Sequence, residues 1–224
     1  MPQSSSKVKS PIVIAGIPIS GSRNPVVTQI SSFELGTPLE KVVDFIKIME
    51  EATGFSCKVN PRGLSNSPLA TSYVFSTREV IESFINCGVP ATVEEMNEIA
   101  YEIDGLLFPD DKDMLKALRL TMEIGTPILF REGDEAVPIG NSFSARSIAF
   151  HPRDTPNFVD NSLIHLVGIT AIEISQKLSE NDVSSLFRFE NGVWSAVYSL
   201  PVPEMSMVKW SWDLQGASLI ELSR

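Results

Sequence analysis

The sequence predicts a mainly α-helical protein: a helical-bundle core with an extended N-terminal arm and a small C-terminal β-hairpin region. Three observations lead to this fold class. Apolar residues recur at helical spacing after recognisable helix starts through most of the chain, and residues 11–33 are apolar but interrupted by prolines. Residues 186–200 alternate apolar and polar side chains around Asn191-Gly192, a typical hairpin pattern. We therefore expect an arm over 1–33, a helical core over 34–183 and a β-rich tail over 184–224.

Helix starts in the expected core are marked by capping sequences. Each of three segments places Ser or Thr three residues before Glu, the spacing of a capping box, and a fourth start falls at Asp110 or Asp111. Gly54, Gly88 and Gly125 mark helix ends, because glycine adopts the left-handed conformation that closes many helices. The three capping segments are Thr37–Glu40, Ser76–Glu79 and Thr92–Glu95.

A fifth and longest helix is expected from Asp160 or Asn161 to about Ser179. It is apolar on nearly every side, a pattern typical of the buried centre of a bundle, so His165 on it is expected to be a core histidine. The arm has the opposite character. Its strand-forming residues are punctuated by Pro11, Pro18 and Pro25, which argue against a regular internal strand. The arm must then lie on its own domain or on a neighbouring molecule.

The charge of the chain is acidic and unevenly distributed. The 224 residues carry a net charge of −10; residues 1–78 have eight Lys or Arg against five Asp or Glu, whereas residues 79–135 have four against fourteen. Attraction of the whole surface to nucleic acid is therefore excluded, while a local basic groove is not. The simplest interpretation of the acidic stretch over residues 79–135 is a solvent-exposed face that favours solubility.

Cysteine content and hydropathy indicate the compartment. Cys57 and Cys87 are too few for a disulfide framework and show no metal-binding spacing, so a reducing compartment is the simpler interpretation, with Cys87 packed against the core. No apolar run reaches the roughly 18–20 residues of a membrane-spanning helix, and no membrane association is expected. A signal peptide over the first residues is conceivable, but Pro18 interrupts its apolar segment and no clean cleavage site follows.

Motifs for catalysis are weak. Gly16–Arg23 looks superficially like a phosphate loop but lacks the terminal G-K-[ST], and the exposed glutamates of residues 94–102 have no histidine among them. We expect no catalytic residue, no metal, no cofactor and no small-molecule substrate, and hence no enzyme. An enzyme remains an alternative, for which His151, Arg153 and Asp154 are the only clustered candidates.

Arginines gather near a loop region rich in Gly, Ser and Asn. Arginine together with small hydroxyl and amide side chains is typical of contacts with a phosphate backbone, and nearby phenylalanines could stack on bases. The alternative is a set of ordinary loop arginines with buried phenylalanine anchors. The residues concerned are Arg119, Arg131, Arg146, Arg153, Arg188, Asn141, Ser142, Ser144, Phe143, Phe150 and Phe158.

Three segments resemble coat proteins of flexible filamentous plant RNA viruses of the potexvirus, carlavirus and potyvirus type, and the plan is shared by some viral nucleoproteins. Residues 78–100, REVIESFINCGVPATVEEMNEIA, resemble a helix–GVP–helix passage of that family. Residues 115–122, LKALRLTM, resemble an arginine-bearing helix, and residues 145–150, ARSIAF, with Thr155-Pro156 and His165 beyond, resemble a further family segment.

The resemblance implies a coat or nucleocapsid protein, found in the virion and the host cytoplasm, that packages single-stranded RNA by sequence-independent backbone contacts. Residues 11–33 would then dock on the next subunit and drive self-association into a filament. The implied RNA-binding residues are Arg119, Ser142, Arg146, Arg153 and Asp154. The alternative is a protein-interaction or matrix-like module without RNA binding, in which the arm folds back on its own domain.

Overall fold

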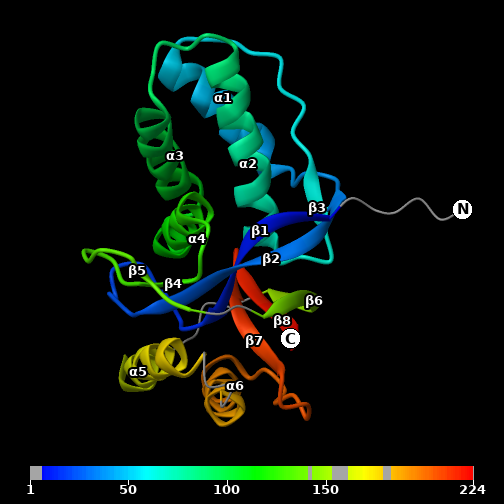
Figure 1. The fold of residues 1–224 in the computed structure, drawn as a ribbon, viewed down its shortest axis with the longest axis vertical. Helices are drawn as coiled ribbons and strands as arrows, with labels where there is room; N and C mark the ends of the chain where they lie inside the picture. Colours follow the sequence, from blue (N-terminus) through cyan, green and yellow to red (C-terminus); the bar gives the residue numbers. More distant parts are fainter. Residues whose placement is uncertain (1–6, 141–142, 153–160, 179–182, 224) are drawn as a thin grey trace, which may run out of the picture.

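The protein is a mixed α/β structure with two antiparallel sheets, as the computed structural model shows (Figure 1). It describes residues 7–140, 143–152, 161–178 and 183–223. The larger sheet has the order β1-β2-β4-β5, with β3 paired to β2, and the smaller has the order β6-β8-β7. The strands are β1 (Lys7–Ala15), β2 (Val26–Gly36), β3 (Gly63–Ser65), β4 (Ile128–Phe130), β5 (Val137–Pro138), β6 (Ser144–Pro152), β7 (Val208–Asp213) and β8 (Gly216–Ser223).

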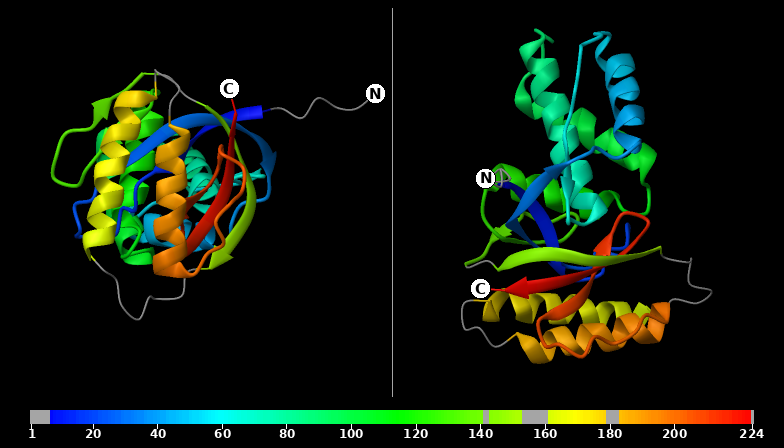
Figure 2. Two further views of the ribbon diagram at one scale, coloured as in Figure 1. Left: turned by 90° about the horizontal axis from the view of Figure 1, so that it is seen from below. Right: turned by 90° about the vertical axis from the view of Figure 1, so that its right-hand side faces the viewer.

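Helices cover the strands from two sides. Helices α1 to α4 lie on one side of the strands, and α5 and α6 lie side by side on the other (Figures 1 and 2). α2 and α4 pack on β1, α4 and α5 pack on β2, and α6 packs on β7. The helices are α1 (Lys41–Thr53), α2 (Leu69–Asn86), α3 (Val93–Leu107), α4 (Lys112–Ile124), α5 (Asn161–Lys177) and α6 (Ser184–Tyr198). The expectation of a mainly α bundle is therefore wrong.

The segment expected to be an N-terminal arm instead forms two strands of the larger sheet, β1 at its edge and most of β2 inside it. β1 and β2 form an antiparallel pair from Lys7 opposite Glu34 to Ala15 opposite Val27, with a register shift between Val13 and Ala15, and Ile12 and Ile14 on β1 are fully buried. Proline is tolerated because β1 is an edge strand, where a missing N–H breaks no ladder on the open side. Pro18 and Pro25 lie in the connection between the two strands.

The hairpin expected at Asn191-Gly192 is also wrong, because both residues lie inside helix α6. The side chain of Asn191 binds the backbone of β7. Its Nδ2 donates to the carbonyl of Val208 (3.0 Å), and its Oδ1 accepts from the backbone N–H of Trp210 (2.9 Å). Asn191 thus satisfies backbone groups of β7, and the β-rich tail is confined to residues 208–223.

Side chains of β2 join the two sheets. Gln29 makes two hydrogen bonds to the backbone of Phe143, at 2.6 and 3.0 Å. Two residues further along β2, Ser31 Oγ accepts from the N–H of Ala145 at 2.8 Å. Both polar side chains are buried away from water, so these bonds supply the hydrogen-bond partners that water cannot. They fix β6 beside β2, which creates the junction described below.

Cys57 and Cys87 form a disulfide that ties the segment after α1 to the end of α2. Cys87 itself is exposed, so its expected packing against the core is wrong. The two sulfurs meet because α1 and α2 run beside each other, a proximity that sequence spacing does not reveal.

Helix α5 confirms the expected long helix but not its burial. Leu166 and Ile169 are exposed, so the helix lies at the surface rather than at the centre of a bundle. His165 is exposed as well, with its Nδ1 3.2 Å from Oδ1 of Asn24. Within the described ranges, none of the helices is both long and apolar enough to cross a membrane.

Candidate functional site

The residues expected to bind RNA do not come together. Arg119 is buried: its Nε donates to Oδ2 of Asp104 (2.7 Å), and its Nη2 donates to Asp104 Oδ1 (2.8 Å) and Thr77 Oγ1 (3.0 Å). A guanidinium with these partners is unavailable to a phosphate backbone. Burial acts to lower its pKa, but the charge and hydrogen bonds of Asp104 outweigh that effect and raise it. Arg119 is therefore a core ion-pair residue.

Arg146 is the expected site residue that does line a cavity. It lies on β6, is exposed, and forms an ion pair with Glu221, its cross-strand neighbour on β8. Ser142, Arg153 and Asp154 lie outside the described residues. His151, a candidate for the enzyme alternative, lies on exposed β6, with its Nδ1 2.7 Å from the carbonyl of Pro152.

The cavity beside Arg146 has a volume of about 530 Å³ and lies where the two sheets meet. Its walls come from four places in the sequence: the start of β1, the end of β2, the segment after β3, and β6. This volume is typical of a small-molecule site. We name it the junction cavity; its lining residues are Lys7, Ser32, Phe33, Glu34, Ser65, Asn66, Ala145, Arg146, Ser147 and Ile148.

The Gly63–Pro68 loop consists of β3 and the turn that follows it; Ser65 and Asn66 line the junction cavity, and Pro68 leads into α2. A side chain at Gly63 would overlap the carbonyl of Thr37, so only glycine fits there. Asn66 has φ of 53°, a left-handed conformation that asparagine tolerates better than most residues. The loop is anchored by Ser65 Oγ to the carbonyl of Leu35 (3.0 Å), and by Ser147 N–H to the carbonyl of Asn66 (3.0 Å).

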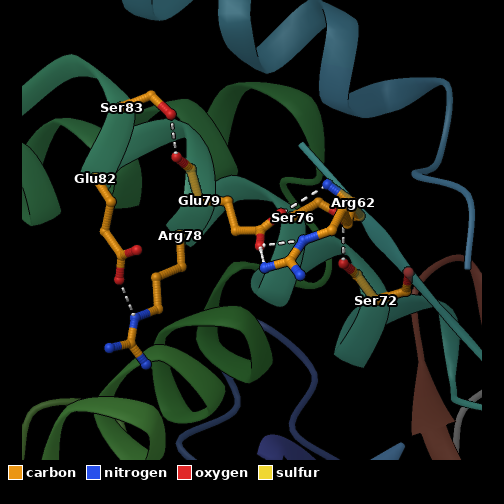
Figure 3. Close-up of polar contacts among 7 residues, drawn as sticks. All are labelled: Arg62, Ser72, Ser76, Arg78, Glu79, Glu82 and Ser83. Carbon is orange, nitrogen blue, oxygen red and sulfur yellow. Dashed lines mark hydrogen bonds and ion pairs between the residues drawn. The ribbon is translucent and has the colours of Figure 1, made fainter. Parts of the chain in front are cut away.

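Arg62 fixes the entrance to this loop (Figure 3). Its guanidinium forms an ion pair with Glu79 on α2, and its backbone N–H donates to the same carboxylate (2.6 Å). Ser76 Oγ donates to the carbonyl of Arg62 at 2.6 Å and to that of Ser72 at 2.8 Å. Ser76 is thus in the middle of α2, and the capping box expected at Ser76–Glu79 is wrong, because the helix already begins at Leu69.

The N-terminus of α2 is occupied by a carboxylate of the chain itself. Asp213, at the end of β7, accepts from the N–H groups of Leu69 (2.9 Å) and Ala70 (2.7 Å) and from Ser218 Oγ (2.6 Å). Helix N-termini favour negative charge, and here Asp213 supplies it. Burial nevertheless raises the pKa of Asp213, although these hydrogen bonds lower it in part.

Two buried hydroxyl oxygens beside this terminus, Ser67 Oγ and Thr71 Oγ1, have no hydrogen-bond partner among the residues that the structure describes. Buried polar atoms are nearly always paired in native structures, so unpaired ones call for an explanation. Both residues lie within three positions of the first residue of α2.

Lys7 and Arg146 supply the positive charge of the junction cavity, and Glu34 lies directly opposite Lys7 in the β1–β2 register. Ser32, Ser65 and Ser147 also line the cavity. Two cations, hydroxyls and a tight loop are the groups that bind phosphoryl oxygens. Sequence reasoning found Arg146 but missed the rest; the run Gly63-Leu64-Ser65-Asn66-Ser67-Pro68 before an apolar helix was the available signal.

The fold is shared with solved structures of kinases, whereas no family model and no curated protein matches the sequence. The chain is similar to mevalonate kinase from Methanococcus jannaschii, with a TM-score of 0.50, 9% identity, and coverage of 100% of this chain and 92% of that one. It is also similar to mevalonate kinase from methicillin-resistant Staphylococcus aureus MRSA252, with a TM-score of 0.51, 13% identity, and coverage of 97% and 90%.

At these identities the likeness establishes the fold and not the activity. It overturns the interpretation of the chain as a non-enzymatic RNA-packaging coat protein or matrix-like module. The expected partners, single-stranded RNA and a neighbouring subunit bound through residues 11–33, are contradicted too, since those residues are largely strands of the chain's own sheet.

Proposed function

We propose that this chain is a small-molecule kinase that binds the phosphates of a nucleoside triphosphate in the junction cavity. The observation that carries the proposal is the position of Lys7 and Arg146 beside the Gly63–Pro68 loop, in a chain with the fold of mevalonate kinases. Phosphoryl transfer depends mostly on positioning and on stabilising negative charge, which are the tasks that such groups perform.

The division of labour follows from the geometry. Asp213 already fills the first N–H groups of α2, so a ligand phosphate would bind mainly through side chains and the loop. Arg146 offers a planar guanidinium for two phosphoryl oxygens, and Lys7 offers a point charge. In the free protein Arg146 is paired with Glu221, and Glu34 lies opposite Lys7 in the β1–β2 register.

Metal ions commonly bridge the phosphates in phosphoryl transfer, and the lining offers oxygen ligands for a magnesium ion. Mg²⁺ is usually held by one or two carboxylates together with substrate phosphates. Glu34 provides a carboxylate and Ser65 a hydroxyl on this cavity. A bound Mg²⁺ would neutralise charge on the phosphoryl oxygens. Among the residues the structure describes, no group of three or more His, Cys, Asp or Glu side chains could hold a metal alone.

The first test is binding of MgATP by isothermal titration calorimetry, followed by an assay of ADP release with mevalonate and a panel of other small alcohols. We expect MgATP binding, and Arg146→Met to weaken it about tenfold or more, because a charge-assisted hydrogen bond contributes about 1.5–3 kcal/mol. Lys7→Met should weaken binding in the same direction.

Arg131→Met is the matched control, because Arg131 is an exposed arginine paired with Asp134 and does not line the junction cavity. MgATP affinity unchanged in Arg146→Met, or no MgATP binding by the wild type, would contradict the site. Binding without ADP release for any alcohol tested would retain the phosphate site but reject the kinase activity for those acceptors.

A further inference from the structure

Helices α5 and α6 form a layer of their own on one side of the strands. Seen from below, the two helices lie side by side across the molecule (Figure 2). Each helix buries the side that packs on the strands and exposes the opposite side. We name this exposed side the α5–α6 face. Its large and charged side chains are Leu166, Ile169, Ile172 and Glu173 on α5, and Arg188 and Phe189 on α6.

The α5–α6 face is rich in large apolar side chains. Leu166, Ile169, Ile172 and Phe189 are each between 36% and 56% exposed. Residues three apart lie on the same side of a helix, so the three apolar residues of α5 form one continuous stripe. Single exposed apolar residues are ordinary on protein surfaces, whereas a continuous apolar surface is typical of an interaction site.

The charges of the α5–α6 face are few and of both signs. α5 and α6 together contain two Lys or Arg and two Glu, so their net charge is zero. One of the glutamates, Glu190, is buried in its ion pair with Lys209. Glu173 and Arg188 remain exposed on the face. Opposite charges on one surface can pair reciprocally when two copies of that surface meet about a two-fold axis.

The acidic charge of the chain lies on the other side of the strands. Residues 79–135 hold fourteen Asp or Glu against four Lys or Arg, and they include the second half of α2 and all of α3 and α4. Figure 1 shows these helices above the strands, and α5 and α6 below them. Like charges repel, so two copies that meet through α5 and α6 keep their acidic helices at opposite ends of the pair. The charge distribution therefore favours this face for contact with a second copy.

We propose that two copies of this chain associate through their α5–α6 faces in a closed two-fold dimer, in which α5 and α6 of each copy form a four-helix packing. The contact is isologous, so it ends at two copies instead of growing into a filament. This inference is independent of the proposed phosphate site, because it uses none of the residues of the junction cavity.

The size of the α5–α6 face sets the expected affinity. α5 has 17 residues and is therefore about 25 Å long. Two such helices about 10 Å apart present a face on the order of 500 Å². Two faces together bury about 1,000 Å², which is near the lower limit for a specific interface. We therefore expect dissociation in the micromolar range.

Sedimentation-velocity ultracentrifugation of the full chain, from about 1 to about 500 μM, tests the proposal. We expect a monomer at the lowest concentration and a dimer at the highest. Ile169→Lys should weaken the dimer about tenfold or more, because it brings two like charges together in the contact. Phe189→Lys should weaken it in the same direction and tests α6 separately. Both residues are exposed, and circular dichroism checks that the variants fold.

Leu106→Lys is the matched control. Leu106 lies on α3, outside the α5–α6 face, and is 71% exposed, which is more than Ile169 at 56%. We expect this variant to dimerise like the wild type. If loss of the dimer were a general effect of a new lysine on the surface, Leu106→Lys would show it as well, and the assignment to α5 and α6 would be wrong.

A wild type that stays monomeric up to about 500 μM would overturn the proposal. A dimer of equal affinity in the wild type, Ile169→Lys and Phe189→Lys would place the contact on another surface and would also overturn it. Flotation with phosphatidylcholine vesicles tests a lipid surface as the occupant. A monomeric wild type that floats with the vesicles, together with an Ile169→Lys variant that does not, would assign the face to lipid instead of a second copy.

Discussion

At the scale of single residues, the most consequential side chain is Arg119. It is an arginine of α4 enclosed by Asp104, Thr77 and the rings of Phe45 and Tyr73. The hydroxyl of Tyr73 also donates to Asp104 at 3.0 Å, which completes a closed polar network. Such a network is stabilising only when each member keeps its partners.

We predict that Arg119→Met destabilises the protein by about 3–5 kcal/mol, because it leaves the carboxylate of Asp104 buried without its cation. Urea unfolding followed by circular dichroism measures this change. Arg78→Met is the control, since Arg78 is exposed and its pairing with Glu82 is screened by water; we expect a change within about 0.5 kcal/mol. Equal costs for the two variants would contradict the burial argument.

Asp213 is the residue for which pH dependence is expected. Burial raises its pKa in the folded state, so the folded protein binds this proton more tightly than the unfolded chain does. The stabilisation from protonation is therefore present below the unfolded pKa of about 3.9 and is lost as pH rises through the folded pKa.

We predict that the difference in free energy of unfolding between the wild type and Asp213→Asn changes with pH. It should favour the wild type most in acid and should shift toward the variant as pH rises from about 4 through the raised pKa of the folded state. Urea unfolding at a series of pH values measures it. Asp44→Asn, at a carboxylate on the surface of α1 paired with Lys41, is the control variant; a flat profile for Asp213→Asn would refute the assigned titration.

At the scale of elements, local chemistry decided several helices. α3 begins with a complete capping box: Glu95 N–H donates to Thr92 Oγ1 (3.2 Å), and Thr92 N–H donates to Glu95 Oε2 (2.8 Å). α1 and α4 are followed by Gly54 and Gly125 in left-handed conformation, as the sequence predicted. These signals act within one turn, so they need no partner from elsewhere in the chain.

We predict that Thr92→Ala lowers the free energy of unfolding by about 1 kcal/mol, because it removes the side-chain acceptor for a backbone N–H of the first helical turn. The change is measured by thermal or urea unfolding. Thr126→Ala, at an exposed threonine in the loop after α4, should have little effect. An equal loss in both variants would show that the capping box adds nothing.

At the scale of the whole molecule, the chain is closed by contacts between distant segments. The start and the end of the chain meet where Lys209 of β7, buried and paired with Glu190 of α6, donates to the carbonyl of Ile14 on β1 (2.6 Å). Glu190 in turn accepts from the N–H of Gly16 at 3.0 Å. Burial lowers the pKa of Lys209, while Glu190 opposes that effect.

The Cys57–Cys87 disulfide gives a prediction at this scale, because it restricts the unfolded chain across a separation of 30 residues. Loop-closure entropy for this length corresponds to about 3–4 kcal/mol. We expect the double variant Cys57→Ser/Cys87→Ser to lose stability of this order in thermal unfolding. Dithiothreitol should lower the Tm of the wild type and leave that of the variant unchanged; a wild type insensitive to the reductant would contradict this role.

The sequence by itself determined the existence of α1, α3, α4 and α5 and the acidic character of the middle of the chain. Helical periodicity and capping residues are local, so they can be recognised without knowing which segments a helix packs against. The sequence did not determine β1 and β2, because the prolines at residues 11, 18 and 25 are compatible either with a free arm or with an edge strand and its connection. The hairpin predicted at Asn191-Gly192 was wrong for a related reason. Turn propensity cannot reveal that the side-chain amide of Asn191 binds the backbone of β7.

Only the tertiary structure decided the candidate sites. The sequence predicted both Arg119 and Arg146 as RNA-binding residues. In the structure Arg119 is buried in an ion pair with Asp104, whereas Arg146 lines the junction cavity. That cavity draws Lys7, Ser65 and Arg146 from segments far apart in the chain. Pairing of sheets and burial of charge depend on contacts across the whole chain, and such contacts leave no periodic trace in the local sequence.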